Sequence, residues 1–189
     1  MMRLKQLSLF MALLLLAGLL SACQQIGQYS LSEQALNSAL QKKLAEYSQS
    51  IDASNMLKMK LDFNKLNLNI GQQQANQVAA NGTAQLSIQT PLATENVSIK
   101  LHLNALPEIN KQQDAIYLKQ VEIADYQIDS RLGSISSGML LPYLNQALQL
   151  YFEHNPIYQL DQSNQLERLA FKSVSNIRVE QGKLVFSML

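Results

Sequence analysis

The chain is short of several residue types, and two of these shortages exclude a kind of site or a class of protein. One cysteine among 189 residues excludes an intrachain disulfide and a metal site with paired cysteine ligands. Tryptophan is absent, and aromatic residues make up only 6% of the chain. Lysine and arginine total 15 against 14 acidic residues, which excludes the strongly basic surface of a general nucleic-acid binder. The uncharged polar residues are mostly amides, with 23 Gln and 14 Asn. The chain as a whole is 47% hydrophobic, which is too apolar for a disordered protein.

The N-terminus carries a targeting signal. Arg3 and Lys5 precede an apolar run over residues 9–20, which is shorter than the roughly 20 apolar residues of a transmembrane helix. The sequence Leu20-Ser21-Ala22-Cys23 then matches the lipobox of bacterial lipoprotein precursors. Residues 1–22 are therefore predicted to be a signal peptide that is removed.

Cys23 is predicted to be the first residue of the mature protein and its lipid anchor. The resemblance to lipoprotein precursors implies that its thiol takes a diacylglycerol and its amine an acyl chain such as palmitate. Gln24 stands where some lipoproteins have aspartate, which implies a periplasm-facing lipoprotein of the outer membrane of a Gram-negative bacterium. Residues 23–29 then form a short tether, and residues 30–189 a single periplasmic, lipid-binding-like domain.

Residues 31–48 are predicted to form the first helix of this domain. Ser30 and Glu33 have the spacing of a capping box, in which Ser30 is the N-cap. An apolar stripe follows at helical spacing, made of Leu36, Ala39, Leu40, Leu44 and Tyr47.

Four long segments alternate between apolar and polar residues, which predicts antiparallel strands with one buried and one solvated face. The alternation slips by one residue at Asn64-Lys65 and twice within the fourth segment, which indicates β-bulges and a curved sheet. A proline closes the second segment and another, Pro107, the third. The segments cover residues 57–70, 78–88, 97–105 and 116–128.

A broad apolar stripe after Ser134 predicts a long helix over residues 135–152, with Pro142 marking a kink or a restart. This helix is the best candidate to cover the apolar face of the sheet. The predicted fold class is α+β: a long curved antiparallel sheet wrapped around a long amphipathic helix, with an N-terminal helix and a C-terminal hairpin. The remaining elements are a short strand at 157–160, a short helix at 164–172 and the hairpin turn Gln181-Gly182.

Two segments of the chain resemble the YceB-like lipoproteins, a bacterial family whose domain has no assigned function. They are Asp114-Ala115-Ile116-Tyr117-Leu118-Lys119 running to Ala124-Asp125-Tyr126, and Leu140-Leu141-Pro142-Tyr143-Leu144-Asn145-Gln146 running to Pro156-Ile157-Tyr158. The resemblance extends over essentially the whole chain. It implies a fold similar to the tubular lipid-binding proteins of the bactericidal/permeability-increasing type. By fold-level analogy, it also implies a lipid or another apolar ligand between sheet and helix.

A ligand groove would be lined by apolar residues of the strands and the long helix. The candidates are Met59, Leu61, Phe63, Leu101, Leu103, Met139, Tyr143, Leu144 and Phe152. The same residues would equally fill a closed core, because both arrangements need apolar side chains on the inner face. Two functions therefore stay open. One is a membrane-anchored lipoprotein that binds a lipid or another apolar ligand, and the other is a non-enzymatic envelope scaffold or accessory protein.

The sequence offers little material for catalysis. His102 falls on the polar face of its strand, and His154 falls at the end of the long helix, where an imidazole suits the helix dipole. Histidines and acids do not cluster at metal-ligand spacing, and there is no glycine-rich loop to hold a phosphate. We therefore expect no enzyme activity, no cofactor, no bound metal and no nucleic-acid partner.

Overall fold

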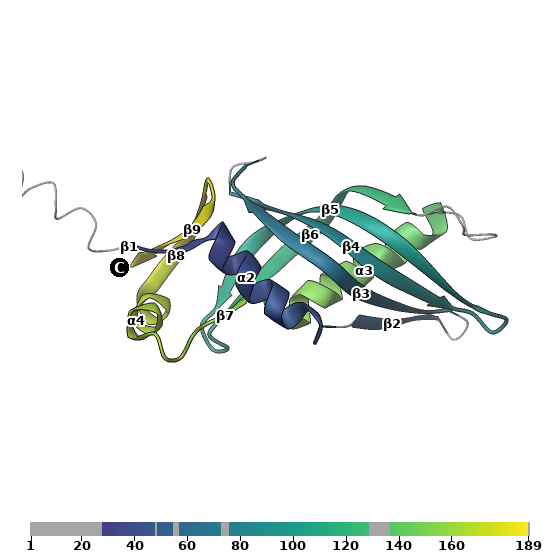
Figure 1. Cartoon of the computed structure of the whole chain (residues 1–189), viewed down its shortest axis with the longest axis horizontal. Coiled ribbons are helices and arrows are strands. Elements are labelled where there is room, and N and C mark those ends of the chain that lie inside the picture. The colour runs from purple at the N-terminus through teal and green to yellow at the C-terminus, as the bar shows by residue number, and fades with distance from the viewer. Residues whose placement is uncertain (1–27, 48, 55–56, 73–75, 129–136, 189) are drawn as a thin grey trace, which may run out of the picture.

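The computed structural model describes residues 28–47, 49–54, 57–72, 76–128 and 137–188 (Figure 1). The predicted signal peptide, Cys23 and residues 24–27 of the predicted tether lie outside the described residues. The elements, in chain order, are β1 (Gln28–Ser32), α2 (Glu33–Leu44), β2 (Gln49–Ser54), β3 (Leu57–Ile70), β4 (Val78–Gln89), β5 (Thr94–Asn110), β6 (Ala115–Ile128), α3 (Ser137–His154), β7 (Tyr158–Gln159), α4 (Gln165–Ser173), β8 (Val174–Glu180) and β9 (Lys183–Met188).

Six antiparallel strands form the larger sheet, in the order β2-β3-β4-β5-β6-β7. The four predicted long strands are confirmed as β3 to β6. The predicted slips are confirmed as shifts of register, one between Phe63 and Lys65 of β3 and two where β5 pairs with β6. β5 does not end at Pro107, as predicted, but continues to Asn110 paired with β6 alone. A proline is tolerated there because a strand with one free side can lack an N–H.

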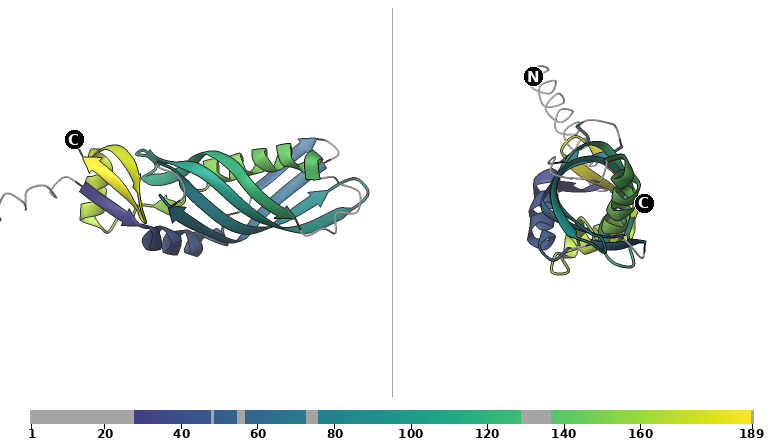
Figure 2. Two further views of the ribbon diagram at one scale, coloured as in Figure 1. Left: turned by 90° about the horizontal axis from the view of Figure 1, so that it is seen from above. Right: turned by 90° about the vertical axis from the view of Figure 1, so that its right-hand side faces the viewer.

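The predicted fold class is wrong. The protein is mostly β, with 55% strand, two antiparallel sheets and three short helices among the described residues, rather than an α+β fold whose curved sheet wraps around a long amphipathic helix. The helix expected in that role, α3, contacts β6 and β2 and lies beside the sheet (Figure 2). The twist of the sheet brings β2 and β6 toward each other, and α3 contacts both strands. Helical periodicity predicts which side of a helix is buried but not against which partner.

A second, three-stranded sheet joins the two ends of the described chain. Its order is β1-β9-β8, so that β1 pairs antiparallel with the last strand, β9. The C-terminal hairpin was predicted, and its turn residue Gly182 has a φ of +74°. β1 was not predicted, because five residues of alternation are a weak signal and the partner strand lies at the other end of the chain.

The start of the first helix also differs from the prediction. Ser30, the predicted N-cap, lies in β1, and helix α2 begins only at Glu33 and ends at Leu44 rather than at residue 48. The N-cap is Ser32, whose hydroxyl oxygen accepts a hydrogen bond from Ala35 N at 3.2 Å. Ser30 and Ser32 are both residues that suit an N-cap. Because the pairing of β1 with β9 holds Ser30 inside a strand, the helix begins only after Ser32.

Helix α2 covers part of the edge of β3. β2 pairs only with residues 57–61 of β3, and further along the strand polar side chains of α2 take the place of a neighbouring strand. Asn37 Nδ2 donates to Leu68 O at 2.9 Å, and Asn37 Oδ1 accepts from Leu68 N at 2.7 Å. Gln41 Nε2 donates to Leu66 O at 2.7 Å. These bonds satisfy edge groups that would otherwise be open to pairing with another chain.

The spacing of these contacts follows from the geometry of a helix beside a strand. Four residues of an α-helix rise about 6 Å, and two residues of a strand rise about 6.7 Å. Side chains at every fourth position of α2, beginning with Glu33, therefore meet backbone groups at every second position of β3. The same helix presents Leu36, Leu40 and Leu44 to the core.

A closed ring of three hydrogen bonds joins the two sheets. Glu33 Oε2 accepts from Ile70 N at 2.8 Å, Ile70 O accepts from Gly182 N at 2.9 Å, and Gly182 O accepts from Glu33 N at 2.8 Å. The next residue of the chain, Gly71, has a φ of +64°, and a Cβ there would lie 2.8 Å from Glu180 O. A glycine is therefore required where β3 meets the β8–β9 turn.

We expect Gly82→Ala to destabilise the protein. A Cβ at position 82 would lie 2.7 Å from a carbon of the buried Phe63 ring, which would have to move within a packed core. Overpacking of this kind costs roughly 1–3 kcal/mol, measurable as a loss in the free energy of unfolding in urea. Gly138→Ala in α3 is the matched control, because nothing lies within 4 Å of its Cβ position. Equal stability of the Gly82→Ala variant and the wild type would contradict this packing.

Candidate functional site

Most of the predicted groove residues lie in the interior. Met59, Leu61, Phe63, Leu101, Leu103, Leu144 and Phe152 are each at most 5% exposed and belong to one hydrophobic core. Tyr143 is partly buried against this core, and the side chain of Met139 lies outside the described residues. A ligand could therefore reach this core only where the core comes close to the surface.

Four aromatic side chains form a cluster where α3 meets β3. The centroid of the Tyr151 ring lies 4.9 Å from that of Phe63, 5.1 Å from that of Phe152 and 6.4 Å from that of Tyr47. The rings are tilted or edge-on to one another, which are favoured arrangements for aromatic pairs. The cluster thus links two predicted groove residues, Phe63 and Phe152, to Tyr47 beyond the end of α2.

A pocket of about 480 Å³ lies over this cluster, between the end of α2 and the bulge of β3. The buried side chains of Leu44 and Phe63 form its base, and the more exposed Gln41, Asp62 and Asn64 form its rim. Small-molecule sites usually enclose about 300–1,000 Å³, so the pocket has a suitable size. Its complete lining is Gln41, Leu44, Ala45, Tyr47, Asp62, Phe63 and Asn64.

A buried hydroxyl belongs to the aromatic cluster beneath this pocket. Tyr151 is 1% exposed, and its hydroxyl oxygen has no hydrogen-bond partner among the described residues. Burial raises the pKa of Tyr151, and the neighbouring pocket residues Tyr47 and Asp62 raise it further, so the hydroxyl stays protonated and able to donate. An unpaired buried polar group costs about 1–3 kcal/mol, so a polar ligand atom that reached it would be stabilised.

A buried acid lies at a second place, between α4 and β7. Glu167 is 2% exposed, and its Oε1 accepts a hydrogen bond from the Tyr158 hydroxyl at 2.5 Å. Burial raises the pKa of Glu167 and outweighs the opposing effect of this hydrogen bond. Asn164, the predicted first residue of the short helix, is its N-cap and accepts from Glu167 N at 3.2 Å. The acid therefore fastens α4 to β7, which is a structural role.

The two histidines lie on separate elements. His154 Nδ1 donates to Leu150 O at 2.8 Å at the end of α3. His102 is exposed on β5, where it lines a hollow of about 230 Å³ together with Lys65 and Lys100. Within the part of the chain that the structure describes, no three His, Cys, Asp or Glu side chains are placed to hold a metal ion.

Sequence reasoning did not single out Tyr47, Tyr151 or Glu167. The two tyrosines belong to apolar stripes of helical spacing, and nothing in that spacing brings them together. Their contact depends on α2 lying along β3 and on α3 lying beside the sheet. Glu167 had a usable signal, because Asn164 and Glu167 have capping-box spacing.

These features define a mostly β protein of two antiparallel sheets with a small pocket above its apolar core. No helix in its described ranges is long and apolar enough to cross a membrane. Residues 31–183 match the family described as protein of unknown function (DUF1439), and the chain belongs to this family.

The YceB-like resemblance is confirmed by two relatives. The chain is 35% identical over 177 residues to the uncharacterized lipoprotein YceB of Salmonella typhimurium, an alignment that covers 93% of this chain and 95% of the relative. It is 34% identical over 178 residues to the uncharacterized lipoprotein YceB of Escherichia coli, covering 94% of this chain and 95% of the relative.

Two solved structures are distantly similar. P47 from Clostridium botulinum A2 aligns with a TM-score of 0.48 and 14% identity, over 86% of this chain and 43% of that one. A lipopolysaccharide binding protein aligns with a TM-score of 0.31 and 13% identity, over 85% of this chain and 40% of that one. Neither likeness is close enough to support a functional argument.

We expect Glu167→Gln to remove part of the pH dependence of stability. The pKa of Glu167 is raised above its ordinary value of 4.5 in the folded protein, so the folded state keeps a proton that the unfolded state releases. The free energy of unfolding therefore falls as the pH rises from 4.5 through the raised pKa. Glutamine still accepts from Tyr158 and does not ionise, so the variant gains stability relative to the wild type across this window.

Urea denaturation of both proteins at acidic and neutral pH measures this difference. Asp161→Asn is the control, because hydrogen bonds from Ser163 lower the pKa of the exposed Asp161 below its ordinary 3.8. Its own contribution to stability changes below that value. Its charge also helps to raise the pKa of Glu167, so this variant should keep the pH dependence over a narrower window. Parallel pH profiles for wild type and Glu167→Gln would contradict the burial of this carboxyl group.

Proposed function

We propose that the protein is an outer-membrane lipoprotein, held by acyl chains on Cys23 and facing the periplasm, whose domain binds a lipid or another apolar ligand. The observation that carries the ligand-binding part is the pocket beside Tyr47. Its lining residues Tyr47 and Phe63 contact the ring of Tyr151, whose hydroxyl has no hydrogen-bond partner among the described residues. Relatives of nearly the same length that are named lipoproteins support the anchoring.

The sequence around Cys23 supports the anchor. The lipobox supports Cys23 as the first residue of the mature chain, and Gln24 supports sorting to the outer membrane. Each methylene buried in the bilayer contributes about 0.8 kcal/mol, so two or three acyl chains suffice for stable attachment. The domain would then work next to a source of lipid.

The pocket suits an amphiphile with an uncharged or zwitterionic head group. Leu44 and Phe63 offer apolar contact at its base, and the rim carries amides. Asp62 also lies at the rim, where its carboxylate disfavours an anionic ligand group. Lys60 Nζ lies 2.8 Å from Asp62 Oδ2, in an ion pair at the surface.

The ligand would reach the core past Tyr47. This side chain is only partly buried, and its ring lies edge-on against Tyr151. In this proposal Tyr47 swings aside, an apolar chain enters along Phe63 toward Phe152, and the Tyr151 hydroxyl donates to a polar atom near the head group. The movement costs little core packing, because Tyr47 lies at the rim of the aromatic cluster.

A scaffold with a closed core is the second candidate function. The observation that favours it is the near-complete burial of the seven described groove residues named above. In both cases we propose no catalytic step, which the separate positions of His102 and His154 support.

Native mass spectrometry of residues 24–189, secreted without the lipidated cysteine, tests the choice between these functions. We expect a reproducible added mass that organic solvent releases and that is identified as a lipid. Uptake of an added zwitterionic phospholipid in preference to a fatty acid would match the acid at the rim. A clean unliganded mass, with no uptake of either, would contradict ligand binding and favour the scaffold.

We expect Tyr151→Phe to stabilise the unliganded protein by about 1 kcal/mol, because it removes an unpaired buried hydroxyl. We also expect it to weaken phospholipid binding about fivefold, the equivalent of one net hydrogen bond. Titration followed by native mass spectrometry measures the affinity. Tyr143→Phe, on the same helix but outside the pocket, is the control. An unchanged affinity in Tyr151→Phe would show that the hydroxyl has no part in binding.

A further inference from the structure

Helix α4 exposes two leucines on its outer face. Leu166 is 74% exposed and Leu169 is 54% exposed, and they lie three residues apart, on one side of the helix. The other large hydrophobic side chain found exposed in the described chain is Leu92, at 98%, in the β4–β5 turn. Single exposed leucines are ordinary, whereas two neighbouring ones on one short helix form a small apolar patch.

The opposite face of α4 is fully packed, so its outer face cannot turn inward. Ala170 and Phe171 are buried, and Glu167 is held by Tyr158. Outside these positions, α4 carries cations and no acid, because Arg168 and Lys172 are exposed beside the leucines. Leucines flanked by basic residues are the composition of helices that lie in a membrane interface.

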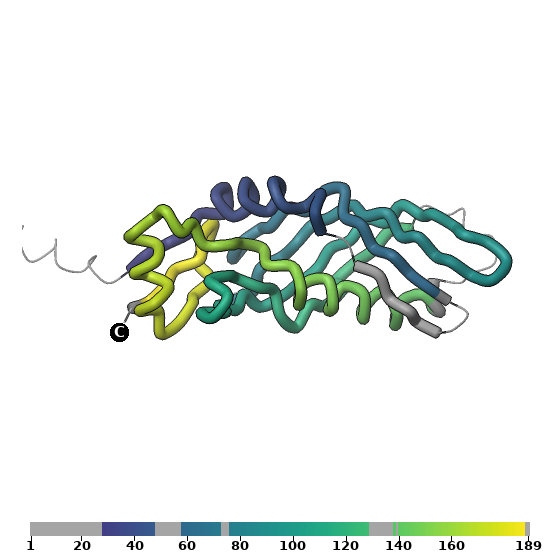
Figure 3. The backbone as a smooth tube through the Cα atoms, turned by 90° about the horizontal axis from the view of Figure 1, so that it is seen from below, coloured from purple at the N-terminus to yellow at the C-terminus, as the bar shows by residue number. Residues whose placement is uncertain are grey.

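The position of α4 in the fold places this face near the predicted anchor. α4 packs against β1 and β9, and all three lie at the same end of the molecule (Figure 3). Phe186 of β9 links them, with ring centroids 5.8 Å from Tyr29 of β1 and 5.4 Å from Phe171 of α4. β1 begins at Gln28, five residues after Cys23, and five residues of extended chain span at most about 18 Å.

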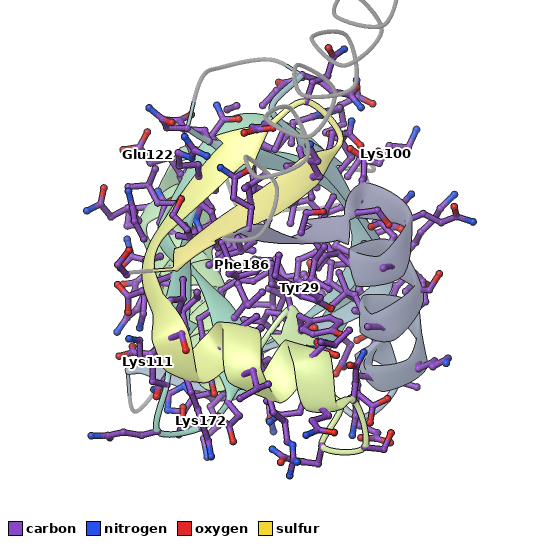
Figure 4. The ribbon with its side chains drawn as sticks, turned by 90° about the vertical axis from the view of Figure 1, so that its left-hand side faces the viewer. Tyr29, Lys100, Lys111, Glu122, Lys172 and Phe186 are labelled. Atoms are coloured by element: carbon purple, nitrogen blue, oxygen red, sulfur yellow. The ribbon has the colours of Figure 1, made fainter. Side chains whose placement is uncertain are left out.

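Further positive charge lies at this end. Figure 4 views the molecule from the end that carries α4. The helix lies at the front, and the labelled Lys111 and Lys172 lie near it. Lys111 Nζ donates to Val174 O at 2.6 Å, which fixes this lysine beside the C-terminal end of α4. Each basic residue near an anionic membrane surface strengthens attachment about fivefold.

We propose that α4 is a second membrane contact, in which Leu166 and Leu169 enter the interface of a bilayer containing anionic lipid. Arg168, Lys172 and Lys111 lie alongside and meet the anionic head groups. The contact rests on the anchoring at Cys23 that forms part of the proposed function, and it is independent of the pocket beside Tyr47. Acyl chains and α4 together would fix the orientation of the domain on the membrane.

The test uses the absence of tryptophan from the chain. The protein beginning at Cys23 is coupled through this single thiol to a maleimide lipid in vesicles of phosphatidylcholine and phosphatidylglycerol. Leu166→Trp then supplies the only tryptophan, and brominated lipids serve as quenchers. We expect its emission to shift to shorter wavelength on the vesicles and to be quenched, and the quenching to weaken at high salt.

Leu92→Trp is the matched control, because Leu92 is also exposed but lies in the turn at the opposite end of the larger sheet (Figure 3). We expect its emission to stay that of a tryptophan in water. Equal spectra and equal quenching for the two variants would overturn the proposal. A shift of Leu166→Trp emission that grows with protein concentration without vesicles would also overturn it and assign the face to a second copy of the chain.

A charge variant tests the role of the cations. Arg168→Gln combined with Lys172→Gln, in the Leu166→Trp background, should lose most of the quenching on vesicles with phosphatidylglycerol. Unchanged quenching would overturn the electrostatic part of the proposal. The maleimide lipid attaches the protein to the vesicle whether or not the cell acylates Cys23, and the measurement does not require ligand uptake. A negative result would therefore count against the α4 contact alone, and not against the anchor or the pocket.

Discussion

The hydrogen bonds between α2 and the edge of β3 are the interaction on which the rest of the structure depends. Without Asn37 and Gln41, the backbone groups of Leu66 and Leu68 would form an open sheet edge directly above the buried core. Glu33 extends the same contact to Ile70 and closes the ring with Gly182. One helix face thus ends the larger sheet and holds the smaller sheet against it.

The pocket follows from the way this edge is covered. β2 covers β3 as far as Leu61, and the side chains of α2 cover it from Leu66 onward. Neither partner pairs with the stretch between them, which contains the bulge and supplies Asp62, Phe63 and Asn64 to the pocket. The entrance of a ligand site at this place would therefore use a gap that the fold requires.

The sequence predicted the parts of the fold that have a local signal. Alternation gave β3 to β6 with their bulges, and Asn164 and Gly182 marked the start of α4 and the C-terminal turn. The sequence did not predict β1, which is short and pairs with the other end of the chain. It also did not predict that α3 lies beside the sheet. The pocket was out of reach for the same reason, because its residues come from elements whose packing partners no local pattern specifies.

The pairing of β1 with β9 also has a mechanical consequence. A pull on the N-terminal segment that is directed along β1 loads this strand from Gln28 toward Ser32. The hydrogen bonds of an antiparallel pair lie across that axis, so they share the force and must break together instead of opening one at a time. The pull continues into α2 through Glu33, whose bonds to Ile70 and Gly182 resist it in turn. The chain is thus built to withstand tension at the end where it is predicted to meet the membrane.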